Sequence, residues 1–148
     1  MRGTDFMNGG KTMVEMDAAH LMEREVVSCE ADTDCQFLAE VMHKRNFGSI
    51  PIVDGHSRLI GIVSECDLLN AIIKGKALSK TPASEVMTEL VVSIPEEMSA
   101  EEVCALLQAR HLIRVPVVDK KGCLVGIVAR RDILASYLES TLGALPHF

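Results

Sequence analysis

Two side chains with different hydrogen-bonding chemistry stand three positions apart in residues 61–67, which read Gly-Ile-Val-Ser-Glu-Cys-Asp. The apolar half of this segment predicts the end of a strand, and the polar half predicts the start of a helix. A helix N-terminus presents unpaired N–H groups and a partial positive charge, which favour a phosphate. The Ser64 hydroxyl can donate to a phosphate oxygen, and the Asp67 carboxylate can accept from ribose hydroxyls. The same residues also fit a plain N-cap with an acidic first turn, and the local sequence leaves both interpretations open.

The segment has a second copy at residues 126–132, which read Gly-Ile-Val-Ala-Arg-Arg-Asp. Asp132 keeps the acidic position, but Ala129 replaces the serine and has no hydroxyl to donate. Arg130 and Arg131 follow it, so positive charge is gained where a hydroxyl is lost. These arginines can contact a phosphate, or they can be solvated charges at a helix start, where the helix dipole makes them mildly unfavourable.

Arg114 is a further candidate, because it directly precedes a Val-Pro-Val-Val-Asp run where the first copy has Ser49. Its planar guanidinium carries five donors and suits phosphate recognition. The competing interpretation is an ordinary surface arginine at the start of a strand.

These residues belong to an internal duplication with one constant offset along most of the chain. Positions that are identical in the two copies include Met22/Met87, Val26/Val91, Val27/Val92, Ser28/Ser93, Pro51/Pro116, Gly61/Gly126 and Asp67/Asp132. The apolar periodicity predicts a helical turn followed by β-α-β-β-α in each copy. We therefore expect a mixed α/β (α+β) fold of two tandem β-α-β-β-α repeats packed about a pseudo-twofold axis.

The expected boundaries follow the duplication. We predict a flexible leader over residues 1–17, a first repeat over 18–75, a linker over 76–82, a second repeat over 83–140 and a short tail over 141–148. The first strands are expected at 26–28 and 91–94, the first long helix is expected to be capped at Thr33, and Ser99 begins a capping box. One repeat is too small to bury its own sheet, so we expect the two to pack together with the binding site in the cleft between them.

Composition excludes several classes of function. The chain of 148 residues is 48% hydrophobic and 3% aromatic, so its core must be aliphatic, and its net charge of −6 argues against nucleic-acid binding. No apolar run approaches the ~18 residues of a membrane span. Five cysteines without a CxxC pair predict reduced thiols in a cytoplasmic protein, either as small apolar residues or with a redox or metal role.

The duplicated pattern resembles the CBS domain over about residues 18–140, and the pair is similar to a Bateman module of the stand-alone type. This resemblance rests on the Met-ending lead-in, the apolar-Pro-apolar-Val-Asp strand and the Gly-Ile-Val-Ser-x-x-Asp segment, all duplicated in register. It implies an adenine nucleotide (AMP, ADP or ATP) or an adenosyl compound as a regulatory ligand, with no required cofactor. It carries the phosphate and ribose roles over to Ser64 and Asp67. Residues 113–119 are also similar to the His-Arg-x-Pro-Val-x-Asp segment of AMP-sensing kinase regulatory subunits, although Ile113 replaces the histidine.

Adenine also needs apolar walls, for which equivalent valines and prolines are candidates, with ordinary sheet core as the competing interpretation. The predicted ligand-binding positions are Val27, Ser49, Pro51, Ser64, Asp67, Val92, Ile113, Arg114, Pro116, Ala129, Arg131 and Asp132.

Three functions compete at this point. The first is a nucleotide sensor that modulates an unidentified partner protein. The second is a ligand-free interaction protein with decayed pockets, which Ala129 and Ile113 favour. The third, an enzyme, is not expected, because the sequence shows no nucleophile–base pair, no metal-spaced ligand set and no complete phosphate-binding loop. The apolar faces of the predicted helices are larger than the thin core of one CBS pair can cover, which predicts a homodimer.

Overall fold

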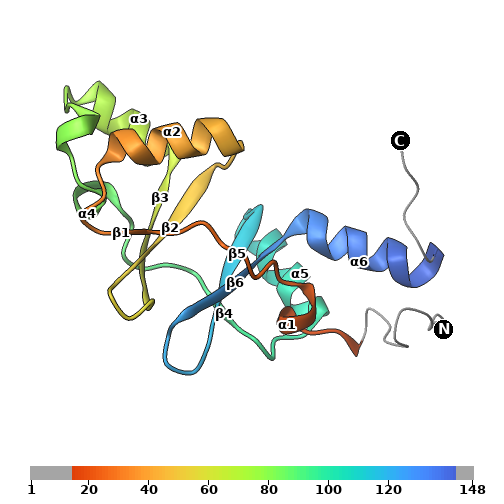
Figure 1. Cartoon of the computed structure of the whole chain (residues 1–148). Helices are drawn as coiled ribbons and strands as arrows, with labels where there is room; N and C mark the ends of the chain where they lie inside the picture. The colour runs from red at the N-terminus through yellow and green to blue at the C-terminus, as the bar shows by residue number, and fades with distance from the viewer. Residues whose placement is uncertain (1–14, 143–148) are drawn as a thin grey trace. The chain divides into compact units, whose positions relative to one another are not determined.

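A computed structural model describes residues 15–142 (Figure 1). Its elements run in the order α1 (Ala18–Leu21), β1 (Cys29–Glu30), α2 (Cys35–Arg45), β2 (Ser49–Val53), β3 (Leu59–Ser64), α3 (Glu65–Ile73), the 3₁₀ turn η3 (Leu78–Lys80), α4 (Ala83–Val86), β4 (Ile94–Pro95), α5 (Ala100–Ala109), β5 (Arg114–Val118), β6 (Leu124–Ala129) and α6 (Arg130–Leu142). The predicted order of elements therefore occurs twice. Most of the predicted leader and tail lies outside the described residues.

The strands form two three-stranded sheets with the orders β1-β2-β3 and β4-β5-β6. In the first sheet, β1 is parallel to β2 and β2 is antiparallel to β3. In the second sheet, β4 is likewise parallel to β5. The mixed α/β architecture with a repeated β-α-β-β-α order is thus confirmed.

Side-chain caps fix where the longer helices begin. The Ser99 Oγ accepts from the Glu102 backbone N at 3.1 Å, and the Glu102 Oε1 accepts from the Ser99 backbone N at the same distance. This is the predicted capping box, and it satisfies two donors that the first turn of α5 leaves open. The cap of α2 is Asp34 rather than Thr33, since the Asp34 Oδ1 accepts from the Phe37 backbone N at 2.8 Å.

The first strand of each sheet starts later than the valine runs predict. β1 pairs with β2 only from Cys29, and β4 pairs with β5 only from Ile94, so the expected strands at 26–28 and 91–94 are shifted. The reason is that residues 26–27 and 91–92 are the points where the chain passes from one compact unit to the other. A segment that passes from one unit to the other cannot pair with a single sheet along its whole length, even where its residues have high β-propensity.

The chain divides into two compact units that do not coincide with the sequence copies. The β1–β3 unit comprises residues 27–91 and 121–124. The β4–β6 unit comprises, within the described range, residues 15–26, 92–120 and 125–142. We call residues 18–23 and 83–88, which contain α1 and α4, the lead-ins of the two copies. The lead-in of the first copy therefore belongs to the unit that contains the sheet of the second copy.

Backbone hydrogen bonds hold each lead-in in its unit. In the β4–β6 unit, the Ala18 N donates to the Met98 O at 2.8 Å, and Glu23 and Ile127 form an isolated antiparallel bridge. In the β1–β3 unit, Ile62 and Thr88 form the corresponding bridge. Each lead-in thus pairs, through its last residues, with the final strand of the sheet beside it.

Each unit has its own aliphatic core. In the β1–β3 unit, α2 and α3 bury Leu38, Met42 and Leu68 against Ile50 and Val63 of the sheet. In the β4–β6 unit, α1, α5 and α6 contribute Leu21, Val103, Leu107 and Ile133, which pack with Val115 and Val128. None of the described helices is both long enough and apolar enough to cross a membrane.

A methionine of each lead-in packs on a glycine that has no Cβ. A Cβ added to Gly126 would overlap the Met22 side chain, lying 2.7 Å from its Cγ and 2.9 Å from its Cβ. A Cβ added to Gly61 would lie 2.6 Å from the Sδ of Met87 and 3.2 Å from the backbone O of Thr88. The absence of a side chain at these glycines lets the lead-in approach the strand closely enough to pair with it.

This packing predicts that Gly126→Ala destabilises the protein by roughly 1–3 kcal/mol, the usual cost of overpacking a well-filled site. The loss should appear as a lower midpoint in urea unfolding followed by circular dichroism. Because Met22 makes the overlap, adding Met22→Ala should make the pair cost less than the sum of the single changes. Gly55→Ala is the matched control, since a Cβ there has nothing within 4 Å. An unchanged midpoint for Gly126→Ala would show that the contact does not constrain the fold.

Candidate functional site

The predicted pair Ser64 and Asp67 lies at the start of α3 as a reciprocal capping box. The Ser64 Oγ accepts from the Asp67 backbone N at 3.2 Å, and the Asp67 Oδ2 accepts from the Ser64 backbone N at 2.8 Å. Both side chains are half-buried. The two residues therefore do form an N-cap. The cap uses only an acceptor site of the Ser64 hydroxyl and one carboxylate oxygen of Asp67. The O–H of Ser64 and the Oδ1 of Asp67 stay available to a ligand.

Asp67 also opens onto a small polar hollow in the β1–β3 unit. The hollow has a volume of about 210 Å³ and lies between α3 and α4, with Lys76 and Glu85 on its wall. The Lys76 Nζ and Glu85 Oε2 are 3.4 Å apart, and both side chains are well exposed. Asp67 is therefore part of a polar, accessible surface and is not enclosed by apolar side chains.

The β4–β6 unit holds Asp132 in the same way. Its Oδ2 accepts from the Ala129 backbone N at 2.9 Å, which reproduces the Asp67 contact in register. Ala129 has no side-chain acceptor for the Asp132 backbone N, so only half of the capping box remains. The two carboxylates thus occupy equivalent, half-buried places at two helix starts.

Ser49 and Arg114 lie beside these helix starts. Ser49 pairs directly with Ser64 across β2 and β3. The Arg130 backbone N donates to the Ile113 O at 2.9 Å, matching the bond from the Glu65 N to the Gly48 O at 3.1 Å. Since β5 and β6 are neighbours in their sheet, this bond sets Arg114 next to Ala129. Arg114, which is half-buried as a residue, therefore occupies the strand position where the other unit has Ser49.

The apolar candidates fall at the same end of each sheet. Val27 and Val92 stand two residues before the first paired positions of β1 and β4, at the level where β2 and β5 begin. Both valines are half-buried, whereas Pro51 and Pro116 are buried inside their strands, as the sheet-core interpretation expects. Contact of any of the four with a ligand stays a prediction.

The remaining two candidates are exposed. Ile113 is 69% exposed immediately before β5, and only its backbone O is used, by Arg130. Arg131 is exposed in the first turn of α6. The predicted site residues divide between the two units. The β1–β3 unit contains Val27, Ser49, Pro51, Ser64 and Asp67. The β4–β6 unit contains Val92, Ile113, Arg114, Pro116, Ala129, Arg131 and Asp132.

Cys29, Cys35 and Cys104 fit small apolar residues better than reactive ones. All five are free thiols. Burial raises the pKa of Cys29 and, with help from the Asp34 and Glu85 charges, that of Cys35. Burial and the charge of Glu101 also raise the pKa of Cys104. A raised pKa keeps a thiol protonated and poorly nucleophilic. Within residues 15–142, no cluster of three or more potential metal ligands occurs.

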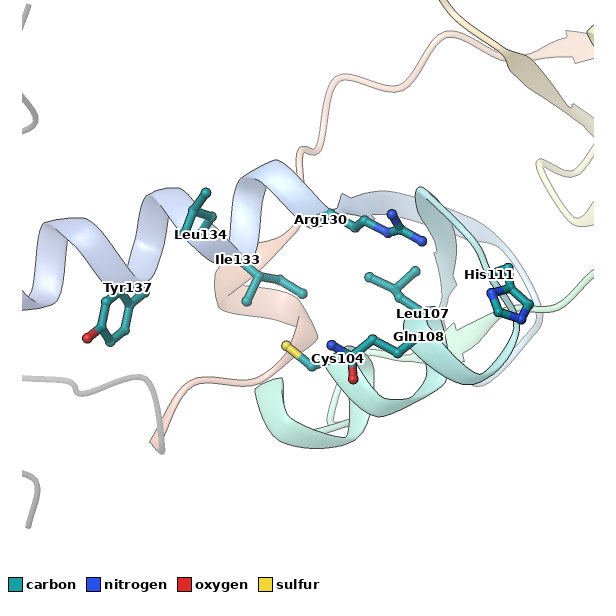
Figure 2. A pocket seen from close by; sticks show the side chains of 8 residues that line it. All are labelled: Cys104, Leu107, Gln108, His111, Arg130, Ile133, Leu134 and Tyr137. Carbon is teal, nitrogen blue, oxygen red and sulfur yellow. The ribbon is translucent and has the colours of Figure 1, made fainter.

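The sequence did not predict a groove between α5 and α6, which Figure 2 shows from close by. It has a volume of about 620 Å³. Buried Leu107 and Ile133 form its floor, and Leu134 and Tyr137 rise from α6 with 60% and 51% exposure. The only sequence signal for it was the apolar stripe of α6, which equally fits a core-facing helix.

Comparison with known proteins identifies the duplicated unit. The family model described as "CBS domain" matches twice, at residues 18–74 and 83–139. The chain belongs to the CBS-domain family. The expected resemblance is thus confirmed, and the two CBS domains follow each other in tandem.

Relatives and solved structures agree with this assignment. The uncharacterized protein YlbB of Bacillus subtilis is 34% identical over 120 residues, which cover 78% of each chain. The CBS domain pair of protein MJ0100, solved with 5′-methylthioadenosine and S-adenosyl-L-methionine, has a TM-score of 0.69 at 26% identity and covers 80% of this chain and 93% of that one. The cytosolic domain of the Mg²⁺ channel MgtE, solved with ATP, has a TM-score of 0.70 at 30% identity and covers 81% of this chain and 48% of that one.

Several other relatives are much longer enzymes. The inosine-5′-monophosphate dehydrogenase of Methanocaldococcus jannaschii is 30% identical over 117 residues, and the CBS pair spans 23% of its length. Similarity of this extent shows a shared CBS pair and does not transfer the dehydrogenase reaction.

The two helix starts predict opposite effects of exchanging serine and alanine. Ser64→Ala should lower the free energy of unfolding by roughly 0.5–2 kcal/mol, because the Asp67 backbone N loses its acceptor. Ala129→Ser should raise it by a smaller amount, because it completes the half-formed box at Asp132. Urea unfolding without ligand measures both changes. Equal stability of Ser64→Ala and the parent protein would show that the hydroxyl does not cap α3 in solution.

Proposed function

We propose that this CBS pair is a regulatory sensor that binds an adenine nucleotide of the AMP, ADP or ATP class, or a related adenosyl compound, and thereby modulates a partner protein. No cofactor is required for this role. The proposal places the protein in the cytoplasm, as the free thiols predict, and makes a homodimer its working form.

One observation carries the proposal. Asp67 and Asp132 are held at equivalent helix starts through Oδ2 alone, at 2.8 and 2.9 Å from a backbone N. Their Oδ1 atoms have no protein partner within the described residues. A carboxylate that is fixed in direction by one oxygen and open at the other is preorganised to accept hydrogen bonds from ribose hydroxyls.

Solved relatives support the class of ligand. The CBS pair of MJ0100 was solved with two adenosyl compounds, and the MgtE cytosolic domain was solved with ATP. These ligands share an adenosine moiety and differ in the group attached to its ribose. We assign the ribose contacts that all these ligands would share to Asp67 and Asp132. Other residues must then select the group attached to the ribose.

Arg114 is the residue that we propose selects a phosphate. It stands beside Ala129, where the serine hydroxyl is missing, and near the first turn of α6. A guanidinium there can form two charge-assisted hydrogen bonds to a phosphate, which compensates for the lost hydroxyl. The β1–β3 unit has Ser49 and Ser64 instead, so it offers hydroxyl donors and no cation in this place.

The alternative is a ligand-free CBS dimer that acts through protein contacts. Ala129 and the 69% exposed Ile113 favour it, because neither supplies a polar side chain to a ligand. The discriminating measurement is calorimetric titration with AMP, ADP, ATP, adenosine, S-adenosylmethionine and NAD. If none of them binds at millimolar concentration, this alternative replaces the sensor.

The sensor predicts a selective effect of Arg114→Gln. The dissociation constant of AMP should rise about tenfold or more, since a hydrogen bond to a charged group contributes about 1.5–3 kcal/mol. The affinity for adenosine, which has no phosphate, should stay unchanged.

Lys120→Gln serves as the matched control, because it removes one positive charge beyond the other end of the same strand. It should leave the affinity for AMP unaltered. Equal losses for AMP and adenosine in Arg114→Gln would mean that the substitution damages the site in general and that Arg114 does not select the phosphate.

A further inference from the structure

The α5–α6 groove of the β4–β6 unit has the size and lining of a small-molecule site. Its volume is about 620 Å³, compared with about 210 Å³ for the polar hollow beside Asp67. Sites for small ligands typically measure roughly 300–1,000 Å³ and are mostly apolar with a few polar groups. Leu107 and Ile133 supply a buried apolar floor here, and Leu134 and Tyr137 supply an exposed apolar rim. The polar groups of the lining indicate the chemistry of the ligand.

Positive charge gathers at one end of the groove. Arg130 at the start of α6 and His111 just beyond the end of α5 lie on the side away from Tyr137, as Figure 2 shows. None of the described residues that line the groove is acidic, although the chain as a whole carries a net charge of −6. This end of the groove therefore favours an anionic group.

The Arg130 side chain is oriented by the backbone and open at its tip. Its Nε donates to the O of Leu112 at 2.7 Å, which fixes the direction of the guanidinium. Within residues 15–142, its two terminal nitrogens have no hydrogen-bond partner. A guanidinium held in this way can form charge-assisted hydrogen bonds to a carboxylate without first giving up protein contacts.

The remainder of the groove suits an unbranched apolar tail. From Arg130 it follows α6 past Ile133 and Leu134 to Tyr137, seven residues along the helix, which is about 10 Å at the usual α-helical rise. Leu134 and Tyr137 are 60% and 51% exposed, so a tail that covers them removes apolar surface from water. A medium-chain carboxylate such as octanoate combines an anionic end with a tail of this length.

The equivalent face of the β1–β3 unit keeps the apolar part and lacks the basic end. Leu69, which is 56% exposed, stands in the place of Leu134, whereas Glu65 stands in the place of Arg130. An acidic side chain at this helix start repels a carboxylate. The combination of a cation and an apolar channel is therefore specific to the β4–β6 unit.

We propose that the α5–α6 groove binds a free medium-chain carboxylate, with the carboxylate group on Arg130 and the tail along Ile133, Leu134 and Tyr137. None of these four residues belongs to the predicted nucleotide set, so this is a second site that does not depend on the nucleotide.

Chain length and charge of the ligand test the two ends of the groove. Calorimetric titration of the full chain uses sodium hexanoate, octanoate and decanoate below their micelle concentrations, with octylammonium as the cationic counterpart. Each added pair of methylenes should lower the dissociation constant about tenfold, because the tail is buried. Octylammonium should bind at least about tenfold more weakly than octanoate. A dissociation constant that is independent of chain length, or tighter binding of octylammonium, would overturn the proposal.

Arg130→Gln separates the charge from the apolar channel. The dissociation constant of octanoate should rise about tenfold or more, and that of neutral octanol should stay unchanged. Arg110→Gln is the matched control, because it removes an exposed arginine just beyond α5 that does not line the groove. Equal losses of octanoate and octanol affinity in Arg130→Gln would show that Arg130 shapes the groove and does not bind the carboxylate, against the proposal.

The apolar rim gives an independent variant. Leu134→Asp should abolish octanoate binding, whereas Leu69→Asp at the equivalent position of α3 should retain it. In methyl NMR spectra of the parent protein, octanoate should shift the signals of Ile133 and Leu134 and leave that of Leu69 in place. Parent-like circular dichroism spectra check the fold of both variants. Shifts confined to α3 would contradict the assigned site.

Other occupants of the groove give different results. If a second copy filled it, Leu134→Asp would dissociate a parent dimer in sedimentation velocity and octanoate would not bind the parent. If a membrane surface filled it, the protein would sediment with phosphatidylglycerol vesicles and would not bind free octanoate. Either result would overturn the proposal. AMP titration of the same samples measures the nucleotide site separately, so failure of the carboxylate site would leave the proposed sensor intact.

Discussion

The close contact between a methionine of each lead-in and a glycine of a sheet is the constraint on which the other features depend. Met22 lies over Gly126 and Met87 lies over Gly61, in each case where a Cβ would overlap the methionine side chain. The contact lets the end of each lead-in pair with β6 or β3 and so fixes where the following segment starts. Residues 24–28 and 89–93 must then run from a lead-in in one unit to the first strand of the other. Val27 and Val92 in these segments therefore lie at the same end of their sheets as the starts of α3 and α6.

Sequence periodicity was sufficient for the order of elements because each element is specified by its own residues. The capping boxes at Ser64 and Ser99 each join two residues only three positions apart, so local sequence determines them. What periodicity could not provide is which copy supplies each part of a compact unit. A repeat of constant offset is equally satisfied when α1 packs on its own sheet and when it packs on the sheet of the other copy. The late start of β1 and β4 has the same origin, since Val27 and Val92 have strong β-propensity but lie at the crossing points.

The candidate site shows the same division between local and distant information. The placement of Asp67 and Asp132 follows from neighbouring backbone donors and could be predicted. The position of Arg114 beside Ala129 depends on how β5 and β6 pair. The sequence pattern of two strands is compatible with several pairing registers and does not select one of them. The α5–α6 groove depends on two helices that are separated by a hairpin. An apolar stripe on α6 alone cannot say which of its residues face the core and which remain exposed.

The two copies have diverged in complementary directions. The β1–β3 unit keeps a full capping box and hydroxyl donors, so its helix start is locally satisfied without a ligand. The β4–β6 unit has Ala129 where the other unit has Ser64, and Arg130 and Arg131 follow it. Positive charges at a helix N-terminus are unfavourable by themselves, and an anion bound among them would remove that penalty. The energetic argument for a phosphorylated ligand is therefore stronger in the β4–β6 unit, even though its cap is weaker.

Arg130 provides a physical link between the candidate ligand set and the α5–α6 groove. Its backbone N holds the O of Ile113, next to Arg114, while its Nε holds the O of Leu112 and its side chain lines the groove. A ligand that favours one arrangement of residues 112–114 would therefore change the groove, and by linkage anything bound in the groove would change ligand affinity by the same factor. A ligand indifferent to that arrangement would change neither. In the β1–β3 unit the equivalent backbone bond is made by Glu65, whose opposite charge would repel a phosphate. Any coupling between the proposed ligand and the groove would thus run through Arg130, and Glu65 offers no equivalent route in the β1–β3 unit.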